Sequence, residues 1–319
     1  MLGTHLFEPD AIDPETLKFN TELERIFETI PPPRTQEPQQ VRDNRETGEG
    51  LIGPLVRLDD FAQERSIPGP AEDIPLRIFI PDMVQGVYLH IHGGGWVRGR
   101  AHHQDQILWE IASQCNVAVV SVDYRLAPEN PYPAGPDDCE AAAAWLANNC
   151  VSEFGSDRLT IGGESAGAHL SAVTLLRMRD RHGFTGFKGA NLTFGMFDLS
   201  FTPSVTNWGE RFLVLSTPDI RWFVDHFVPE HKRREADVSP LYADLSDMPA
   251  ALFVVGTWDP LLDDTLFMYP RWLAAGNQAE IAVYPGGVHG FTRLETAQGE
   301  ESRRNIRRFI SACTKGNPS

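Results

Sequence analysis

The strongest chemical signal in the sequence is a serine held between two glycines, in Gly163-Glu164-Ser165-Ala166-Gly167. This G-x-S-x-G spacing is typical of a sharp turn from a strand into a helix, which strains the serine backbone and exposes its hydroxyl. The pattern is short enough to occur by chance, so its context matters. Leu159 to Ile161 precede it as a buried strand, and apolar residues follow at helical spacing: Ala166, Ala168, Leu170, Val173 and Leu176. We therefore predict that Ser165 is a nucleophile.

A serine hydroxyl is a poor nucleophile until a base takes its proton, so the chain must supply a histidine and an acid. In sheets of this kind these follow the serine in the order Asp or Glu, then His. Asp259 comes just after the strand expected at 250–256, and His289 follows the strand expected at 280–284. Because sites of open α/β sheets form beyond the carboxyl ends of strands, we expect Asp259 and His289 to be the acid and the base.

Other titratable residues compete for these roles. Asp198 also lies at the end of an expected strand and is an alternative acid. Asp263 and Asp264 are expected to cap the helix that follows them. His102 and His103 are expected in a surface loop.

The segment His92-Gly93-Gly94-Gly95 follows the strand expected at 86–91. Three glycines after a strand let backbone N–H groups turn inward toward a developing negative charge. The segment does not match a phosphate-binding loop, which needs a following G-K-[ST], and its glycines miss the dinucleotide-binding spacing by one residue. The remaining alternative is a tight turn without a chemical role.

Together these motifs resemble the hormone-sensitive-lipase-like carboxylesterases, bacterial family IV of the α/β-hydrolase superfamily. The resemblance runs from about residue 75 to the end and rests on His92–Trp96, Tyr124–Glu129, Gly163–Gly167, Asp259–Leu261 and His289–Phe291. It implies a doubly wound, mostly parallel eight-stranded sheet with a helical cap. It also implies an oxyanion hole formed by the N–H groups of Gly94, Gly95 and Ala166. Many members have Asp before the serine where this chain has Glu164, so the subfamily stays open.

The resemblance also implies the domain organisation. We expect cap helices over 1–50 and a catalytic domain over 51–319, to which 200–246 contributes a cap insertion. Asp13-Pro14 should begin a helix ended by Pro31–Pro33, and a polar stretch from Gln36 to Gly50 suggests a mobile joint. The helix should present one apolar face, made by Leu17, Leu23, Ile26, Phe27 and Ile30. Whether this segment is a lid or only packs on the core stays open.

Aromatic residues are expected to form a substrate pocket under this cap. They are Trp96 and, in the insertion, Trp208, Phe212, Trp222 and Phe223. Binding sites for small molecules are concave and mostly apolar, which suits this composition. The alternative is that these aromatics only pack the cap onto the core.

The remaining elements alternate between strand and helix, which favours a mostly parallel sheet. We expect strands over 74–80, 117–122 and 190–199. Helices are expected over 104–115, 137–149, 166–181, 264–275 and 296–313.

The composition excludes some partners. The 319 residues carry a net charge of −16, which argues against nucleic acid or an anionic membrane as a partner. The start of the chain lacks the features of a signal peptide, and no apolar run is long enough for a membrane span. The cysteines, Cys115, Cys139, Cys150 and Cys313, lack metal-like spacing and read as free thiols, which favours a cytoplasmic location.

The expected function is hydrolysis of short- to medium-chain acyl esters by a serine carboxylesterase. The expected partner is a small-molecule ester, with no metal and no cofactor, and a homodimer is possible. One alternative is an amide or formamide hydrolase with the same residues. Another is a non-catalytic receptor like the plant gibberellin receptors, which resemble this family but lack the histidine found here at 289.

Overall fold

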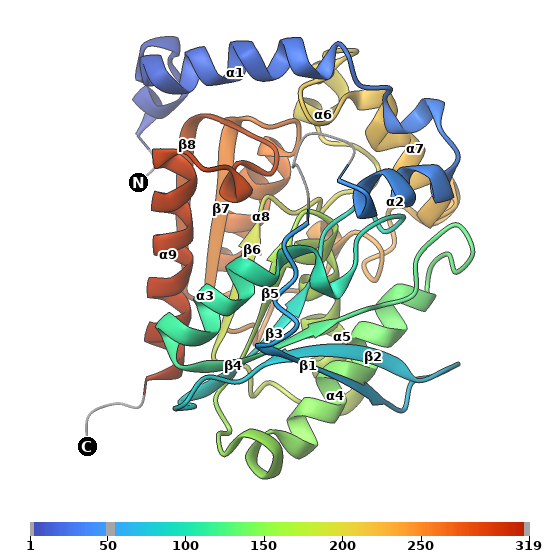
Figure 1. Cartoon of the computed structure of the whole chain (residues 1–319), viewed down its shortest axis with the longest axis vertical. Coiled ribbons are helices and arrows are strands. Elements are labelled where there is room, and N and C mark those ends of the chain that lie inside the picture. Colours follow the sequence, from blue (N-terminus) through green and yellow to red (C-terminus); the bar gives the residue numbers. More distant parts are fainter. Residues whose placement is uncertain (1–2, 49–54, 316–319) are drawn as a thin grey trace.

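The computed structural model describes residues 3–48 and 55–315. Within them, eight strands form a single sheet in the order β1-β2-β4-β3-β5-β6-β7-β8, with β1 and β2 antiparallel to their neighbours and the rest parallel (Figure 1). The strands are β1 Ala62–Ile67, β2 Ile74–Phe79, β3 Gly86–Ile91, β4 Val117–Val122, β5 Leu159–Glu164, β6 Gly189–Thr193, β7 Ala251–Trp258 and β8 Ala279–Val288. The expected mostly parallel, eight-stranded sheet is confirmed.

Helices cover both faces of this sheet, so its central strands are apolar throughout. All residues of β3 and β4 are buried. One face packs on α3 Asp105–Cys115 and α9 Ala297–Thr314, which also contact each other. The other face packs on α4 Ala134–Phe154, α5 Ala166–His182 and α8 Leu262–Ala274. The chain is therefore wound on both sides of the sheet, as alternation of strands and helices predicts.

Three elements near the site differ in length from the prediction. β6 ends at Thr193 instead of 199, because Phe194 adopts a φ of 36° that an extended strand does not allow. β7 and β8 are longer, because both continue through turn-like sequence that includes Gly256 and Gly286. Their extension carries the chain directly to Asp259 and His289.

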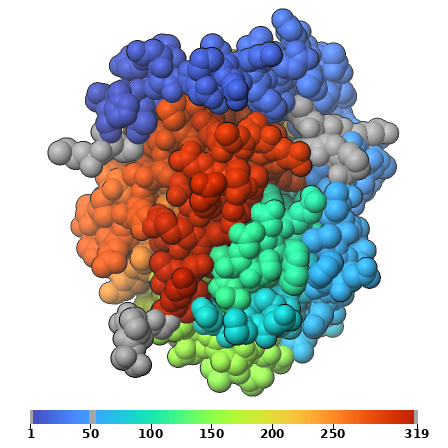
Figure 2. Space-filling view, turned by 60° about the vertical axis from the view of Figure 1, so that its left-hand side comes forward, coloured from blue at the N-terminus to red at the C-terminus, as the bar shows by residue number. Residues whose placement is uncertain are grey.

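Four helices lie together beyond one end of the sheet (Figure 1). They are α1 Pro14–Phe27, α2 Pro38–Glu46, α6 Pro203–Trp208 and α7 Thr217–Phe227. The N-terminal segment covers this end of the molecule in the space-filling view (Figure 2). Arg34, between α1 and α2, connects the N-terminal segment to α7, because its guanidinium lies 3.0 Å from the carboxylate of buried Asp219 in α7. Phe27 of α1 packs edge-on against Phe212, with ring centroids 4.9 Å apart.

Two predictions about the N-terminal segment are wrong in detail. Leu17 and Ile26 are exposed, because α1 turns a narrower stripe inward that consists of Asn20, Leu23 and Phe27. The polar stretch from Gln36 to Gly50 contains helix α2, and Gly50 itself lies outside the described residues.

Helix α2 shows no apolar pattern because hydrogen bonds and an ion pair hold it in place. Val41 is the buried apolar residue of α2. Arg42 donates to the carbonyls of Val97 and Ala127 at 2.7 Å each and pairs with Glu129. None of the described helices is long and apolar enough to cross a membrane.

Candidate active site

Ser165 lies at the sharp bend between β5 and α5, with a φ of 56° that non-glycine residues rarely adopt. The two flanking glycines allow this bend. A Cβ added to Gly163 would lie 2.0 Å from the Ile91 carbonyl oxygen, and one added to Gly167 would lie 1.9 Å from the same atom. Only glycine fits at such distances, so β3 and the start of α5 pack with no side chain between them.

His289 and Asp259 form a hydrogen-bonded chain with this serine. Nε2 of His289 lies 2.9 Å from Oγ of Ser165, and Nδ1 lies 2.9 Å from Oδ2 of Asp259. The other carboxylate oxygen of Asp259 accepts the N–H of Leu261 at 2.8 Å. Asp259 is 1% exposed and His289 7%, so water does not compete strongly for these bonds. With Nδ1–H donated to the carboxylate, Nε2 is free to accept the serine proton.

The competing carboxylates are engaged elsewhere. Asp198 accepts the N–H of Ser200 and the hydroxyl of Tyr242, each at 2.8 Å. The expectation that Asp263 and Asp264 cap α8 is wrong, because the segment 197–204 crosses the start of that helix and supplies the donors instead. Asp264 accepts the N–H groups of residues 197 and 198, and Asp263 accepts that of residue 204.

The glycine loop faces the serine from the end of β3. Gly94 and Gly95 have φ values of 127° and 61°, which the absence of a side chain allows. Together with Ala166 they line the same cavity as Ser165. Within the described residues, the N–H groups of Gly94, Gly95 and Ala166 donate to no protein acceptor. Three free donors around one hydroxyl are what a developing oxyanion requires.

The side chain of Glu164 holds the glycine loop in place by hydrogen bonds. Its Oε1 accepts the N–H of Gly93 at 2.8 Å and also bonds the side-chain amide of Gln104. Its Oε2 lies 3.2 Å from Nε2 of His90. Burial alone would raise the pKa of the Glu164 carboxyl, but His90 and the N–H of Gly93 lower it below its usual value. The carboxylate therefore stays ionised and connects the loop to the strand that carries the serine.

A cavity of about 240 Å³ opens in front of Ser165, between the sheet and the cap helices. Of the expected pocket residues, Trp96, Phe212 and Phe223 line it. Trp208 does not line it, and its indole N–H donates to the carbonyls of Arg211 and Leu215. Trp222 also lies outside it, next to His226 on a separate surface hollow.

Three arginines in the cavity wall were missed by the sequence analysis. They are Arg45 from α2, Arg98 from the loop after β3 and Arg293 from the segment after His289. They come from three distant parts of the chain, and no motif connects them. Only the spacing of Arg98 and Arg293 relative to the glycine loop and His289 could have drawn attention to them.

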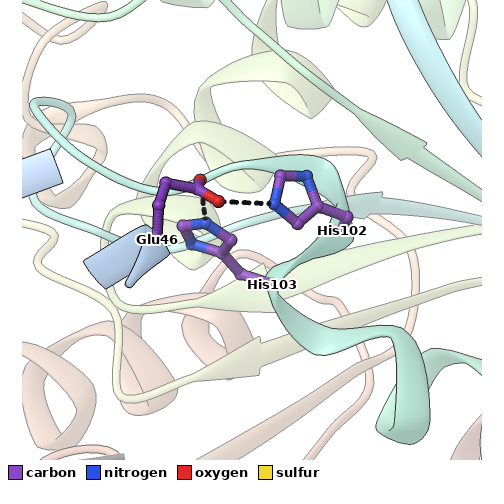
Figure 3. Close-up of side chains that lie close together, drawn as sticks. All are labelled: Glu46, His102 and His103. Atoms are coloured by element: carbon purple, nitrogen blue, oxygen red, sulfur yellow. Dashed lines mark hydrogen bonds and ion pairs between the residues drawn. The ribbon is translucent and has the colours of Figure 1, made fainter. Parts of the chain in front are cut away.

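Glu46, His102 and His103 form a compact group between α2 and the segment that precedes α3 (Figure 3). Nε2 of His103 lies 2.7 Å and Nε2 of His102 lies 3.1 Å from the Glu46 carboxylate. The histidines are thus half-buried in a short 3-10 helix, and the prediction of a surface loop is wrong.

The donor atoms of this group lie within 4.8 Å of one another, close enough to hold a divalent cation. Hydrogen bonds already account for the arrangement, however. Burial is the main cause that lowers the pKa of His103 to about 3, and Arg45 lowers it further, so the ring is neutral and donates its proton to Glu46. The positive charge of Arg45 also disfavours a bound cation. We therefore infer that the hydrogen bonds of this group hold α2 against the segment that precedes α3.

A serine bonded to a buried histidine and aspartate beyond the carboxyl ends of parallel strands defines the class of α/β hydrolases. Residues 88–293 match the family model of the alpha/beta hydrolase fold. The chain is 34% identical over 257 residues to the carboxylic ester hydrolase LipN of Mycobacterium tuberculosis, which covers 77% of this chain and 68% of that protein. It is 36% identical over 237 residues to the carboxylesterase NlhH of the same species, covering 70% and 72%.

Solved structures agree with these sequence matches. A hyperthermophilic esterase from the archaeon Pyrobaculum calidifontis superposes with a TM-score of 0.84 at 27% identity, over 94% of this chain and 98% of that one. The chain belongs to the α/β-hydrolase fold family. The resemblance to hormone-sensitive-lipase-like carboxylesterases, stated from the motifs, is confirmed.

Proposed function

We propose that this protein is a serine carboxylesterase that hydrolyses short- to medium-chain acyl esters through an acyl-enzyme intermediate. The observation that carries the proposal is the hydrogen-bonded chain from Ser165 through His289 to Asp259, with both hydrogen bonds at 2.9 Å. The names of the matched relatives support the same class of reaction.

The proposed mechanism follows the geometry. His289 takes the proton of Ser165 while Oγ attacks the ester carbonyl carbon, and Asp259 stabilises the imidazolium that forms. The N–H groups of Gly94, Gly95 and Ala166 stabilise the tetrahedral oxyanion. His289 then protonates the leaving alkoxide. In the second half, His289 activates a water molecule that attacks the acyl carbon, and the acid is released with Ser165 protonated again.

The size of the cavity supports the proposed chain length. At about 240 Å³ it is below the range of roughly 300–1,000 Å³ that is common for ligand sites, which suits a small ester. Phe212, Phe223 and Trp96 contribute apolar wall, and a long acyl chain would need them to move. We also propose that 1–50 and 200–246 act together as the cap over a catalytic domain that spans 51–319. A homodimer stays a prediction.

An amide or formamide hydrolase would use the same residues. Comparing kcat/KM for an ester and an anilide of butyric acid separates the two, and we expect the ester to be hydrolysed at least about 100-fold faster. A receptor function is disfavoured because His289 is present and bonded to the serine. Anilide hydrolysis at the ester rate would replace this proposal with an amidase, and hydrolysis of neither compound would favour the receptor.

A further inference from the structure

Three guanidinium groups line the cavity in front of Ser165, and among the described residues none of them forms an ion pair. Arg98 lies over the face of Phe223, with its Cζ 5.3 Å from the ring centroid. Arg293 donates one hydrogen bond, to the carbonyl of His103 at 3.3 Å. No hydrogen bond to the side chain of Arg45 is formed by the described residues. Each group is held near the cavity, and most of its N–H donors are unused.

The nearest carboxylates have other partners. Asp219 pairs with Arg34, and Glu46 binds two histidines. Glu164, the one acidic residue of the described cavity wall, binds the glycine loop. The part of the wall formed by residues 3–48 and 55–315 therefore carries three positive charges against one negative charge, in a protein whose net charge is −16. An acidic surface cannot attract anions from a distance, so this local excess of positive charge needs its own explanation.

It is costly to bury three like charges even partly when no described carboxylate pairs with them, and the pKa values of the three arginines reflect this cost. Burial and the two other arginines lower the pKa of Arg45 to about 9. Burial and Arg293 lower the pKa of Arg98 to about 10, and burial lowers that of Arg293. Guanidinium groups nevertheless remain charged at neutral pH. Such an arrangement destabilises the empty protein and is relieved when an anion binds.

We propose that the natural substrate is an ester that carries a carboxylate or a comparable anionic group, which Arg45, Arg98 and Arg293 bind at the end remote from the ester bond. This inference rests on the proposed function and adds to it the chemical class of the substrate. A carboxylate fits the site because guanidinium groups bind it with paired N–H donors. Phe212 and Phe223 would contact the apolar part between the two ends.

The test compares esters that differ only in charge. Monoethyl adipate carries a carboxylate on the acyl side, and its half-amide is a neutral molecule of the same shape. The second pair is 5-acetoxypentanoate and 5-acetoxypentanamide. These acetate esters carry the carboxylate or the neutral carboxamide on the alcohol side. We expect kcat/KM to be at least about tenfold higher for the charged member of one pair, since hydrogen bonds between two charged groups are stronger than those to a neutral amide. The pair that shows the preference identifies the side of the substrate that binds the arginines.

Variants then assign the preference to the three arginines. Arg45→Met, Arg98→Met and Arg293→Met should each raise KM for the preferred anionic ester by roughly 10- to 100-fold. The same variants should lower kcat/KM for the neutral ester of the pair by a much smaller factor, so that the ratio of kcat/KM for the charged ester to that for the neutral ester falls at least about tenfold. Arg98→Lys should restore part of the preference. Arg100→Gln is the matched control, because Arg100 is exposed, pairs with Asp123 and does not line the cavity.

The outcomes separate this inference from the proposed function. Hydrolysis of the neutral esters with no preference for either charged ester would overturn the inference and leave the esterase standing. Equal losses on charged and neutral esters in all three variants would also overturn it, because the arginines would then serve structure alone. If no ester of either pair is hydrolysed, the proposed esterase function is contradicted, and the inference about its substrate is contradicted with it. Labelling of Ser165 by a fluorophosphonate probe is the control that identifies which variants retain an intact site.

Discussion

Oγ of Ser165 and Nε2 of His289 lie 2.9 Å apart although 124 residues separate them in the chain. The contact exists because β5 and β8 end at the same edge of the sheet. Ser165 leaves β5 in a strained turn, and His289 directly follows the last residue of β8. The chemistry proposed here depends on this edge and on the position of Asp259 just beyond β7.

Asp259→Asn should lower kcat for p-nitrophenyl butyrate by about 10⁴-fold, because the imidazole loses the carboxylate that holds its tautomer and stabilises its charge. Asp198→Asn should change kcat by less than about threefold, since Asp198 bonds Ser200 and Tyr242 instead. Steady-state kinetics on both variants check this. A larger loss at Asp198 would assign the acid to the segment after β6.

Phe223→Ala and Phe212→Ala should shift the preferred acyl length upward, because each removes a side chain from the cavity wall. Trp208→Ala and Trp222→Ala are matched controls from the same insertion that do not line the cavity. They should lower the melting temperature and leave the length profile unchanged. The measurement is kcat/KM over a series of p-nitrophenyl esters. If all four variants share the profile of the unmodified protein, the cap does not limit the acyl site.

Much of the site could be predicted from local sequence. Ser165, Asp259 and His289 each follow an apolar strand, and the edge of a parallel sheet brings strand ends together whatever their distance in the chain. Gly163 and Gly167 also fit the sharp turn that the spacing predicted, since a side chain at either position would meet the Ile91 carbonyl.

The charged lining of the cavity could not be predicted in the same way. Arg45, Arg98 and Arg293 meet only after the cap folds over the sheet, and among the residues that the structure describes none of them pairs with a carboxylate nearby in sequence. Helix α2 was missed for a related reason, because Arg42 holds it by polar bonds that leave no apolar period. The pattern of apolar residues predicts which residues form the core. The contacts of Arg42 and of the three cavity arginines are polar and lie between segments outside the core, so that pattern does not predict them.

Gly167→Ala should destabilise the fold far more than Gly155→Ala. An added Cβ at Gly167 meets the Ile91 carbonyl oxygen at 1.9 Å, and backbone on both sides must move. Gly155 ends α4 with a φ of 75° and nothing within 4 Å of the added atom, so only backbone strain of about 1–2 kcal/mol applies. Urea unfolding of both variants measures the difference. Equal losses would mean that the packing of α5 against β3 tolerates a methyl group.

Asp264 should make the protein less stable as the pH rises from about 4 to about 7. Burial raises the pKa of its carboxyl from 3.8 to about 7, so the folded state binds more protons than the unfolded state within this window. Stability contributed by the protonated form is therefore lost as the pH rises through the folded pKa. Asp264→Asn keeps acceptors for residues 197 and 198 and should flatten this part of the curve.

The measurement for Asp264 is the free energy of unfolding in urea at several pH values. Asp263→Asn, one position earlier at the start of α8, controls for the loss of any carboxylate there. An Asp264→Asn variant whose curve runs parallel to that of the unmodified protein would contradict the assignment.

Labelling with a fluorophosphonate probe tests the central claim most directly, because it asks whether Ser165 is an activated nucleophile without assuming a substrate. Intact-mass and peptide spectra of the unmodified protein should show one probe per chain, attached to Ser165. Ser165→Ala should not be labelled, should keep its melting temperature within a few degrees, and should lose on the order of 10⁴- to 10⁶-fold in kcat for p-nitrophenyl butyrate. An unlabelled but folded protein, or a folded Ser165→Ala variant with full activity, would contradict the account.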